Sequence, residues 1–469
     1  MSRLLTAFRR CLSSVATTAP SPGPTTTTVL RSSVSASSIA AVTAASMVAY
    51  TSAVAVLDPA GDIPEDGRNK IHHVKDGSGK TVKFQNPYPS AARETSPWSI
   101  APKILWLTIT GKLKMPKPDP SKPETLGVSV VTPNLPSADA TRTPPSKLRA
   151  TWLGHACYFV EFPSGLRVLF DPVFESRCGP HGILGPPRYT PPACSLADLP
   201  PVDAVIISHS HYDHLSLGSV KTLAARNPQV QFFVGLGLAK WFRSSGIERV
   251  TEMDWWQDAE LTLTKKEEGR EAKAEEGNQG QQSTTSPDVS NPASTTPNSI
   301  TARITCLPCQ HASGRTGFDF DTTLWASWSV KSGDKSVWFA GDTGYRLHTA
   351  DSAEEAHKDD NTPDVVITHC PQFKQIGELR GPFDLALIPI GAYRPRYLFS
   401  WMHADPYDAV DIFRDTRCRR ALGMHWGTWV LTYEEVDEPP RLLKKALKER
   451  GLEEEGVFEV CGIGETREF

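Results

Sequence analysis

The chain has 469 residues, 39% of them hydrophobic and 22% charged, which supplies a large core and excludes global disorder. Its formal net charge of −3 argues against a duplex nucleic-acid binder, because such proteins usually carry a strong basic excess. Nine irregularly spaced cysteines exclude a disulfide scaffold and favour a reducing compartment or buried free thiols.

The first 57 residues have the composition of a mitochondrial targeting segment. Serine, threonine and alanine dominate this segment, and no Asp or Glu occurs before Asp58. The only charged side chains in it are those of Arg3, Arg9, Arg10 and Arg31. An acid-poor, Ser-rich start that carries arginines is typical of a transit peptide. We therefore expect residues 1–57 to direct the protein to mitochondria, in association with the inner membrane.

Within this segment, Ile39–Leu57 is moderately apolar and uncharged. About 20 apolar residues suffice to span a bilayer, but alanine, serine and threonine weaken this run. A membrane anchor and a plain presequence tail both stay open as interpretations.

The rest of the chain divides at about residue 148. Residues 58–83 are polar and contain glycine, and residues 111–147 are rich in Pro, Lys and Thr, so we expect 58–147 to be a linker and an N-terminal extension. From Leu148 to the end, short β-branched and aromatic runs predict one domain of many strands. The predicted strands are Leu148–Phe162, Leu166–Phe170, Ala204–Ser208, Gln231–Val234, Ala302–Leu307, Leu324–Val330, Ser336–Ala340 and Leu385–Pro389. The predicted helices are Ser216–Arg226, Leu238–Ser244, Pro406–Thr416 and Pro440–Arg450.

Two stretches interrupt this domain. Residues 265–299 open with a mixed charge run and continue with Gln, Ser, Thr, Pro and Asn, a composition that cannot bury a core. Residues 346–362 form a shorter acidic stretch of the same kind. We expect both to be disordered insertions.

The strongest chemical signal is SHSHYDHL at residues 208–215, directly after the apolar run 205–207. Side chains two apart at a strand end point the same way, so His209 and His211 can face one metal ion. Asp213 and His214 lie further round the turn and can face a second ion. Imidazole and carboxylate are ligands that Zn²⁺ accepts in a site that keeps a position for water.

Three further positions show the same pattern, an apolar run followed by a residue that can bind a metal ion. They are His311 in CLPCQHASGR, Asp342 in VWFAGDTGY and His425 in ALGMHWGTW. An aspartate at such a position can bridge two ions with its two oxygens. The seven residues together predict a hydrolase that uses two metal ions.

In this order, HxHxDH, a distant His, an Asp in GDTG and a late His resemble the metallo-β-lactamase superfamily. Four longer runs, at 151–162, 171–180, 186–215 and 388–410, are similar to the N-acylphosphatidylethanolamine-hydrolysing phospholipase D family. FQNPYPS at 84–90 is also similar to that family. The resemblance covers roughly residues 84–469 apart from the two insertions. It implies an α/β fold, an αββα sandwich with the metals at one edge of two sheets.

The resemblance also implies roles for single residues. His209, His211 and His311 would hold a first zinc ion. Asp213, His214 and His425 would hold a second, with Asp342 bridging the two. His403 in WMHADP matches a family histidine near the metals that is not a ligand, and we expect it to contact or protonate the phosphate. Asp213, Asp342 and His403 are thus the residues expected to take part in catalysis.

The expected reaction is hydrolysis of N-acylphosphatidylethanolamine to an N-acylethanolamine and phosphatidate, with two Zn²⁺ per chain. The expected partners are a membrane phospholipid, the membrane surface and a second copy of the chain, with no nucleic acid. Two apolar stretches, Tyr397–Met402 and Ile100–Ile109, either contact the bilayer or belong to the core. The alternatives are a lactonase or thioesterase with the same cage, a nuclease of this fold and a non-catalytic membrane scaffold.

Overall fold

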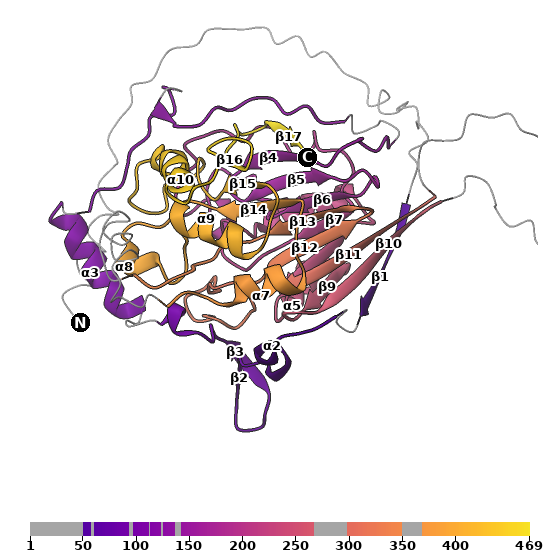
Figure 1. Ribbon diagram of the computed structural model, residues 1–469, viewed down its shortest axis with the longest axis horizontal. Coiled ribbons are helices and arrows are strands. Elements are labelled where there is room, and N and C mark those ends of the chain that lie inside the picture. The colour runs from indigo at the N-terminus through magenta and orange to yellow at the C-terminus, as the bar shows by residue number, and fades with distance from the viewer. Residues whose placement is uncertain are drawn as a thin grey trace, which may run out of the picture. The chain divides into compact units, whose positions relative to one another are not determined.

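A computed structural model gives the fold. It describes residues 50–57, 61–92, 97–111, 113–122, 125–136, 142–266, 298–348 and 368–469. Two large β-sheets dominate the part of the chain from Ser46 onward, and a small two-stranded sheet lies beside them (Figure 1). The expected αββα sandwich is the fold of this domain.

The larger sheet has eight strands. In sheet order they are β1 (Tyr50–Leu57), β10 (Asp258–Lys265), β11 (Ser299–Leu307), β12 (Ser327–Ser332), β13 (Lys335–Phe339), β14 (Leu385–Pro389), β15 (Ala421–Met424) and β16 (Phe458–Glu459). In this sheet order, each neighbouring pair from β1 through β10, β11 and β12 to β13 is antiparallel. The neighbouring pairs from β13 to β16 are parallel.

The second sheet has seven strands. In sheet order they are β17 (Thr466–Glu468), β4 (Arg149–Gly154), β5 (Cys157–Glu161), β6 (Arg167–Phe170), β7 (Ala204–Ile206), β8 (Gln231–Gly235) and β9 (Val250–Met253). Strands β6 to β9 are parallel. Residues of β5, β6, β7 and β8 are all buried, as expected for strands that are covered on both faces.

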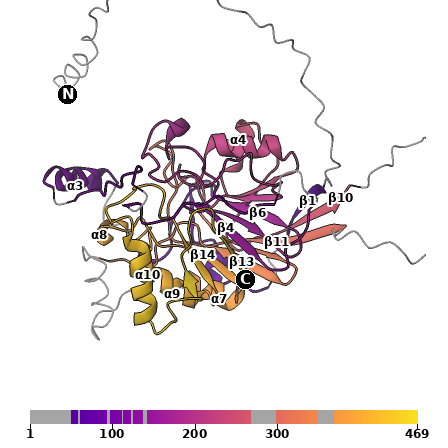
Figure 2. The same ribbon diagram turned by 90° about the horizontal axis from the view of Figure 1, so that it is seen from above.

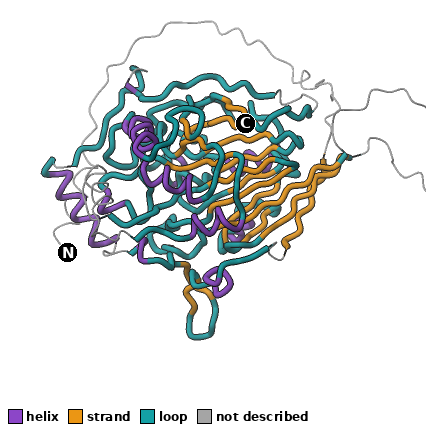
Figure 3. Tube along the Cα trace, viewed as in Figure 1, coloured by secondary structure: helices purple, strands orange, loops and turns teal. Residues whose placement is uncertain are grey.

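Helices cover the outer faces of both sheets. Residues of α4 (Leu217–Arg226) and α5 (Ala239–Ser244) pack on the seven-stranded sheet. On the other side, α7 (Gln372–Leu379), α9 (Pro406–Asp415) and α10 (Glu438–Glu449) pack on the eight-stranded sheet. Figure 2 shows α4 on one side of the strands and these three helices on the other, and Figure 3 shows helices in front of and beside the strands. The remaining helices are α2 (Glu65–Asn69), α3 (Pro97–Ile109) and α8 (Arg396–Phe399).

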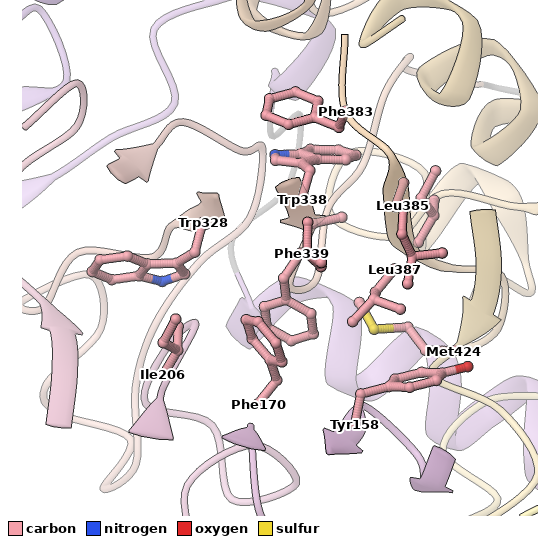
Figure 4. Close-up of a cluster of buried hydrophobic side chains, with 14 of the residues drawn as sticks. Tyr158, Phe170, Ile206, Trp328, Trp338, Phe339, Phe383, Leu385, Leu387 and Met424 are labelled. Atoms are coloured by element: carbon pink, nitrogen blue, oxygen red, sulfur yellow. The ribbon is translucent and has the colours of Figure 1, made fainter. Parts of the chain in front are cut away.

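The core lies between the two sheets. Phe170 of one sheet and Phe339 of the other have ring centroids 4.8 Å apart, and both side chains are fully buried. Ile206, Trp328 and Leu387 belong to the same cluster, as Figure 4 shows. Since burying one large apolar side chain stabilises a fold by about 1.5–3 kcal/mol, this layer fixes the relative position of the two sheets.

Most predicted strands and helices are present, with two corrections near the N-terminus. Residues 50–57 were expected to end a targeting segment with a possible anchor, but they form β1, paired antiparallel with β10. Residues 58–83 were expected to be a linker. The described part of this stretch instead contains α2, β2 (His73–Lys75) and β3 (Thr81–Phe84). These elements are too short and polar to show a periodic apolar pattern.

The targeting prediction for residues 1–49 lies outside the described residues. Among the described helices, none combines the length and the apolar character that crossing a bilayer requires. The two predicted insertions also lie largely outside, since residues 267–297 and 349–367 are not described. The first insertion joins β10 to β11, whose described ends pair in register at Thr264 and Ser299.

We expect a deletion of residues 267–297, closed by a short glycine-containing turn, to fold like the full chain. The strands that flank this segment already pair as an antiparallel hairpin, and a shorter loop costs less closure entropy. The thermal unfolding midpoint should stay within a few degrees of the full-length value. A deletion protein that aggregates or melts much earlier would show that the segment contributes to the fold.

Candidate metal centre

The seven predicted ligands meet at one edge of the sandwich. Residues 208–214 follow β7, and His311, Asp342 and His425 follow β11, β13 and β15. These strands belong to both sheets, and each ends at the same edge. The topology thus gathers side chains from four separate places in the sequence.

One group consists of three histidines. The Nε2 atom of His209 lies 2.8 Å from Nδ1 of His211, and Nε2 of His311 lies 3.2 Å from the same Nδ1. His209 and His311 are buried, whereas His211 is half-buried. Three ring nitrogens that converge in this way match the three imidazoles expected at a first metal position.

The second group combines histidines with carboxylates. The Oδ2 atom of Asp342 lies 3.1 Å from Nε2 of His214 and 2.8 Å from Nε2 of His425. The Oδ2 atom of Asp213 lies 3.3 and 3.4 Å from the same two nitrogens. Asp342 also reaches toward the first group, with 3.8 Å between Oδ2 and Nε2 of His311. Its carboxylate therefore lies between the two groups.

The donor atoms of this centre fit a bound metal ion. Nε2 of His214 and Nε2 of His425 are buried and face Oδ2 of Asp342 without hydrogen-bond geometry, and the buried Oδ1 of Asp342 makes no hydrogen bond to a described residue. Buried polar atoms almost always have a partner, so these atoms point to a ligand between them. A divalent cation satisfies imidazole nitrogens and carboxylate oxygens at once.

Asp171 holds two of the histidines in the orientation that a metal requires. Its Oδ2 accepts a hydrogen bond from Nδ1 of His214 at 2.6 Å, which leaves Nε2 free to bind. It also accepts from the Ser208 hydroxyl at 2.5 Å, and that hydroxyl contacts Nδ1 of His209 at 2.9 Å. Such outer contacts fix the tautomer of a ligand. Asp171 lies in the family-like run 171–180, but the sequence alone assigned it no role.

A second support comes from the N-terminal segment. The side-chain amide of Asn86 accepts a hydrogen bond from the backbone N–H of His311 at 3.1 Å and donates to its carbonyl at 2.7 Å. Ser90 binds the neighbouring Gln310 through two hydrogen bonds, at 2.6 and 3.2 Å. Nδ1 of His311 donates to the carbonyl of Met402 at 2.8 Å. Residues 84–90 are therefore part of the centre, which their family-like sequence alone did not reveal.

His155 lies closer to the centre than its place in the sequence suggests. Its Nε2 is 3.0 Å from Oδ2 of Asp213, and its ring centroid is 4.1 Å from that of His425. Its backbone carbonyl accepts from the N–H of His425 at 3.0 Å. The sequence favours a role beside the ligands or in packing for this histidine rather than metal ligation, and the turn between β4 and β5 brings it to Asp213.

His403 borders the centre on the side of Asp342 and His311. Its Nδ1 lies 3.9 Å from Oδ2 of Asp342 and makes no hydrogen bond to a described residue. Arg396 fixes the loop, because its guanidinium donates to the carbonyl of His403 at 2.8 Å and is itself fully buried. Burial lowers the pKa of His403 to about 3, against the opposing effect of Asp342. His403 is therefore neutral at physiological pH.

Burial and the two carboxylates act in opposite directions on the other imidazoles. Burial lowers the pKa of His209 and His311 well below the usual value, so both rings keep a lone pair for a metal. Burial also opposes protonation of His425, but Asp342 and Asp213 outweigh it and raise its pKa to about 9. The carboxylates thus favour positive charge at this position, and a metal ion would supply it.

A narrow cavity of about 30 Å³ reaches His425 from one side. Trp426, Trp429 and Leu431 are among the residues that line it. The loop that carries His211 and Asp213 is partly exposed to the solvent.

We expect Asn86→Ala to lower zinc affinity about 10–100-fold, which is the usual cost of losing a contact that orients a metal ligand. The change removes both hydrogen bonds that hold the backbone of His311. Gln85→Ala is the matched control, because the Gln85 amide is exposed and donates to the carbonyl of Ile71. Zinc competition with a chelating dye measures the effect, and wild-type affinity in Asn86→Ala would refute this role.

Comparison with known proteins agrees with this geometry. A family model described as "Beta-lactamase superfamily domain" matches residues 166–369 and 361–426. N-acyl-phosphatidylethanolamine-hydrolyzing phospholipase D 1 of Caenorhabditis elegans is 35% identical over 329 residues, which cover 69% of this chain and 76% of that protein.

Two further relatives are more distant. The mitochondrial N-acyl-phosphatidylethanolamine-hydrolyzing phospholipase D of Saccharomyces cerevisiae is 29% identical over 296 residues, 63% of this chain and 50% of that protein. A metal-dependent hydrolase of Methanopyrus kandleri is 25% identical over 314 residues, 66% of this chain and 96% of that protein. The chain is thus a metal-dependent hydrolase, and it belongs to the N-acyl-phosphatidylethanolamine-hydrolysing phospholipase D family of the metallo-β-lactamase superfamily.

Proposed function

We propose that this protein hydrolyses N-acylphosphatidylethanolamine to an N-acylethanolamine and phosphatidate with two zinc ions. The observation that carries this proposal is the convergence of seven ligand side chains in a chain that is 35% identical to the nematode enzyme of that name. His209, His211 and His311 would hold one ion, and Asp213, His214 and His425 the other. Asp342 would bridge them, since its Oδ2 lies near both groups.

When bound, two such ions activate a water molecule at neutral pH and neutralise charge on the phosphate oxygens. The protein's own part is to hold the ligands in place and to exclude bulk water. Asp171 and Met402 set the ring tautomers, and Asn86 positions the backbone of His311. The described residues thereby keep the centre rigid during the reaction.

His403 is the residue that we place against the phosphate. A neutral imidazole with an unpartnered Nδ1 can donate one hydrogen bond to a phosphate oxygen. The lowered pKa favours this contact over transfer of a proton from an imidazolium. Of the two expected roles, contact with the phosphate is therefore the one that we retain.

The membrane surface is the proposed source of the substrate. Helix α3 exposes three large apolar side chains, with 61% of Leu105, 54% of Trp106 and 75% of Ile109 accessible. In the other stretch expected to contact lipid, Leu398 and Trp401 are buried core residues. We therefore assign the bilayer contact to α3 rather than to Tyr397–Met402.

We also propose a mitochondrial location and a homodimer. The location rests on the acid-free start of the chain and on the yeast relative, whose name includes "mitochondrial". The dimer rests on the resemblance to the family. A lactonase, a thioesterase or a nuclease with the same set of metal ligands is less consistent with the long similarity to N-acylphosphatidylethanolamine hydrolases.

The direct test is to incubate the purified protein with a panel of N-acylated and plain phospholipids, a lactone, a thioester and single-stranded DNA. We expect release of N-acylethanolamine from the N-acylated phosphatidylethanolamines alone. A chelator should abolish the release and zinc should restore it. Turnover of the lactone, the thioester or the DNA, together with no turnover of any phospholipid, would overturn the proposal.

We expect His403→Ala to keep both metal ions and to lower kcat roughly 100-fold or more, the scale for losing one contact to a developing charge. His311→Ala should lose metal and activity together. Metal analysis and turnover of both variants separate the two roles. Normal turnover of His403→Ala would reduce this histidine to a packing role, and loss of an ion would make it a ligand.

We expect replacement of Leu105, Trp106 and Ile109 by serine to weaken binding to phospholipid vesicles at least about tenfold, because each apolar side chain buried in lipid contributes about 1.5–3 kcal/mol. Turnover of a short-chain, water-soluble substrate should not change. Val82→Ser serves as control, since Val82 is 44% exposed on β3, away from α3. Equal vesicle binding by the triple variant and the wild type would exclude α3 as the membrane contact.

A further inference from the structure

A second cluster of metal-ligand side chains lies outside the candidate centre. His72 precedes β2, His73 begins it, and Asp254 follows β9, 182 residues after His72. Nε2 of His72 lies 2.8 Å from Oδ1 of Asp254, and Nε2 of His73 lies 3.0 Å from its Oδ2. Two segments far apart in the sequence thus bring two imidazoles to one carboxylate.

The cluster is enclosed by protein. The side chains of His72, His73 and Asp254 are only 2%, 7% and 3% exposed. The ring of His72 stacks on Trp255 with centroids 4.2 Å apart. Such an environment shields an ion that binds there from bulk solvent.

The other ring nitrogen of His73 has a partner of the kind that metal-bound histidines use. Its Nδ1 lies 2.9 Å from the hydroxyl of Thr81 on β3. With Nδ1 donating its proton to this oxygen, the lone pair of Nε2 is directed at the cluster.

From this geometry we propose that His72, His73 and Asp254 form a third, structural metal site for a divalent transition ion of the zinc class. Two imidazoles and a carboxylate with water in the fourth position are a known zinc ligand set. Tetrahedral bonds of about 2.0–2.1 Å place ligand atoms about 3.3 Å apart. Oδ1 of Asp254 lies 2.8 Å from Nε2 of His72 and 3.2 Å from Nε2 of His73, close to this spacing, and the three ligand atoms lie within 4.8 Å of one another.

Lys70 is the competitor for this site. Its ammonium lies 3.0 Å from Oδ2 of Asp254, while half of its side chain is exposed. In the metal-free protein this charge compensates the buried carboxylate. A bound dication replaces that compensation, and the flexible lysine moves into the solvent at little cost. Removal of the lysine should thus strengthen metal binding.

An ion at this site would fasten the N-terminal segment to the sandwich. The β2–β3 hairpin leads directly into Asn86, which holds the backbone of His311. Asp254 belongs to the main domain, at the end of β9. The third ion would thus stabilise the segment that supports the catalytic centre without taking part in the reaction.

The test is to titrate metal-free, full-length protein with zinc, comparing the wild type with His72→Ala, Thr81→Ala and Lys70→Met. We expect the wild type to bind one zinc more per chain than His72→Ala, whatever number the main centre holds. Thr81→Ala should weaken that extra ion about tenfold, and Lys70→Met should tighten it at least about tenfold. His181→Ala is the control, since His181 is exposed and lies outside both clusters.

Equal zinc numbers in the wild type and a folded His72→Ala would overturn the proposal and leave a hydrogen-bonded network around Asp254. Circular dichroism establishes whether His72→Ala folds. If it does not, Lys70→Met decides, because unchanged zinc binding in that variant contradicts the site. Hydrolytic activity stays near the wild-type level in Lys70→Met, so a failure here is distinct from a failure of the proposed function.

Discussion

The structure depends on a buried cluster of carboxylates and imidazoles. Hydrogen bonds within the protein do not satisfy all of their polar atoms. Asp213 and Asp342 bring two carboxylates to one edge of the sandwich, and five imidazoles surround them. Nε2 of His214 and Oδ1 of Asp342 make no hydrogen bond to described residues, although both are buried. Leaving such groups unpaired costs about 1–3 kcal/mol each. Bound metal ions would remove this cost, and the rest of the domain holds these side chains in position.

The support around the centre comes from unexpected parts of the chain. Asp171 orients two rings from within the seven-stranded sheet, and Arg396 fixes the loop that carries His403. Asn86 lies between β1 and β4 in sequence, outside both large sheets, yet it binds the backbone of His311. The N-terminal extension is therefore a component of the hydrolase domain, and the region between β1 and α3 carries both a support and a second cluster of ligand side chains.

The sequence predicted the seven candidate ligands because strand ends, glycines and ligand types recur together around residues 208–214, 342 and 425, and the structure brings these side chains together. The same reasoning could not identify Asp171 or Asn86, because an aspartate after a strand and an asparagine before a proline are common in turns. It also misjudged residues 50–57. Their apolar, uncharged pattern resembles part of a membrane span, and only the pairing with β10 shows that they form a sheet edge. Pairing partners that lie 200 residues apart leave no local signal.

The measurement that tests the central claim most directly is hydrolysis of N-acylphosphatidylethanolamine in ¹⁸O-labelled water while zinc is added back to metal-free protein. Activity should rise to a plateau at two zinc ions in the main centre, and one ¹⁸O atom should appear in phosphatidate and none in the N-acylethanolamine. The Asp342→Asn variant should show neither the rise nor the label. Turnover that persists without metal, or label found in the N-acylethanolamine, would contradict a phosphodiesterase that uses two zinc ions bound by these seven residues.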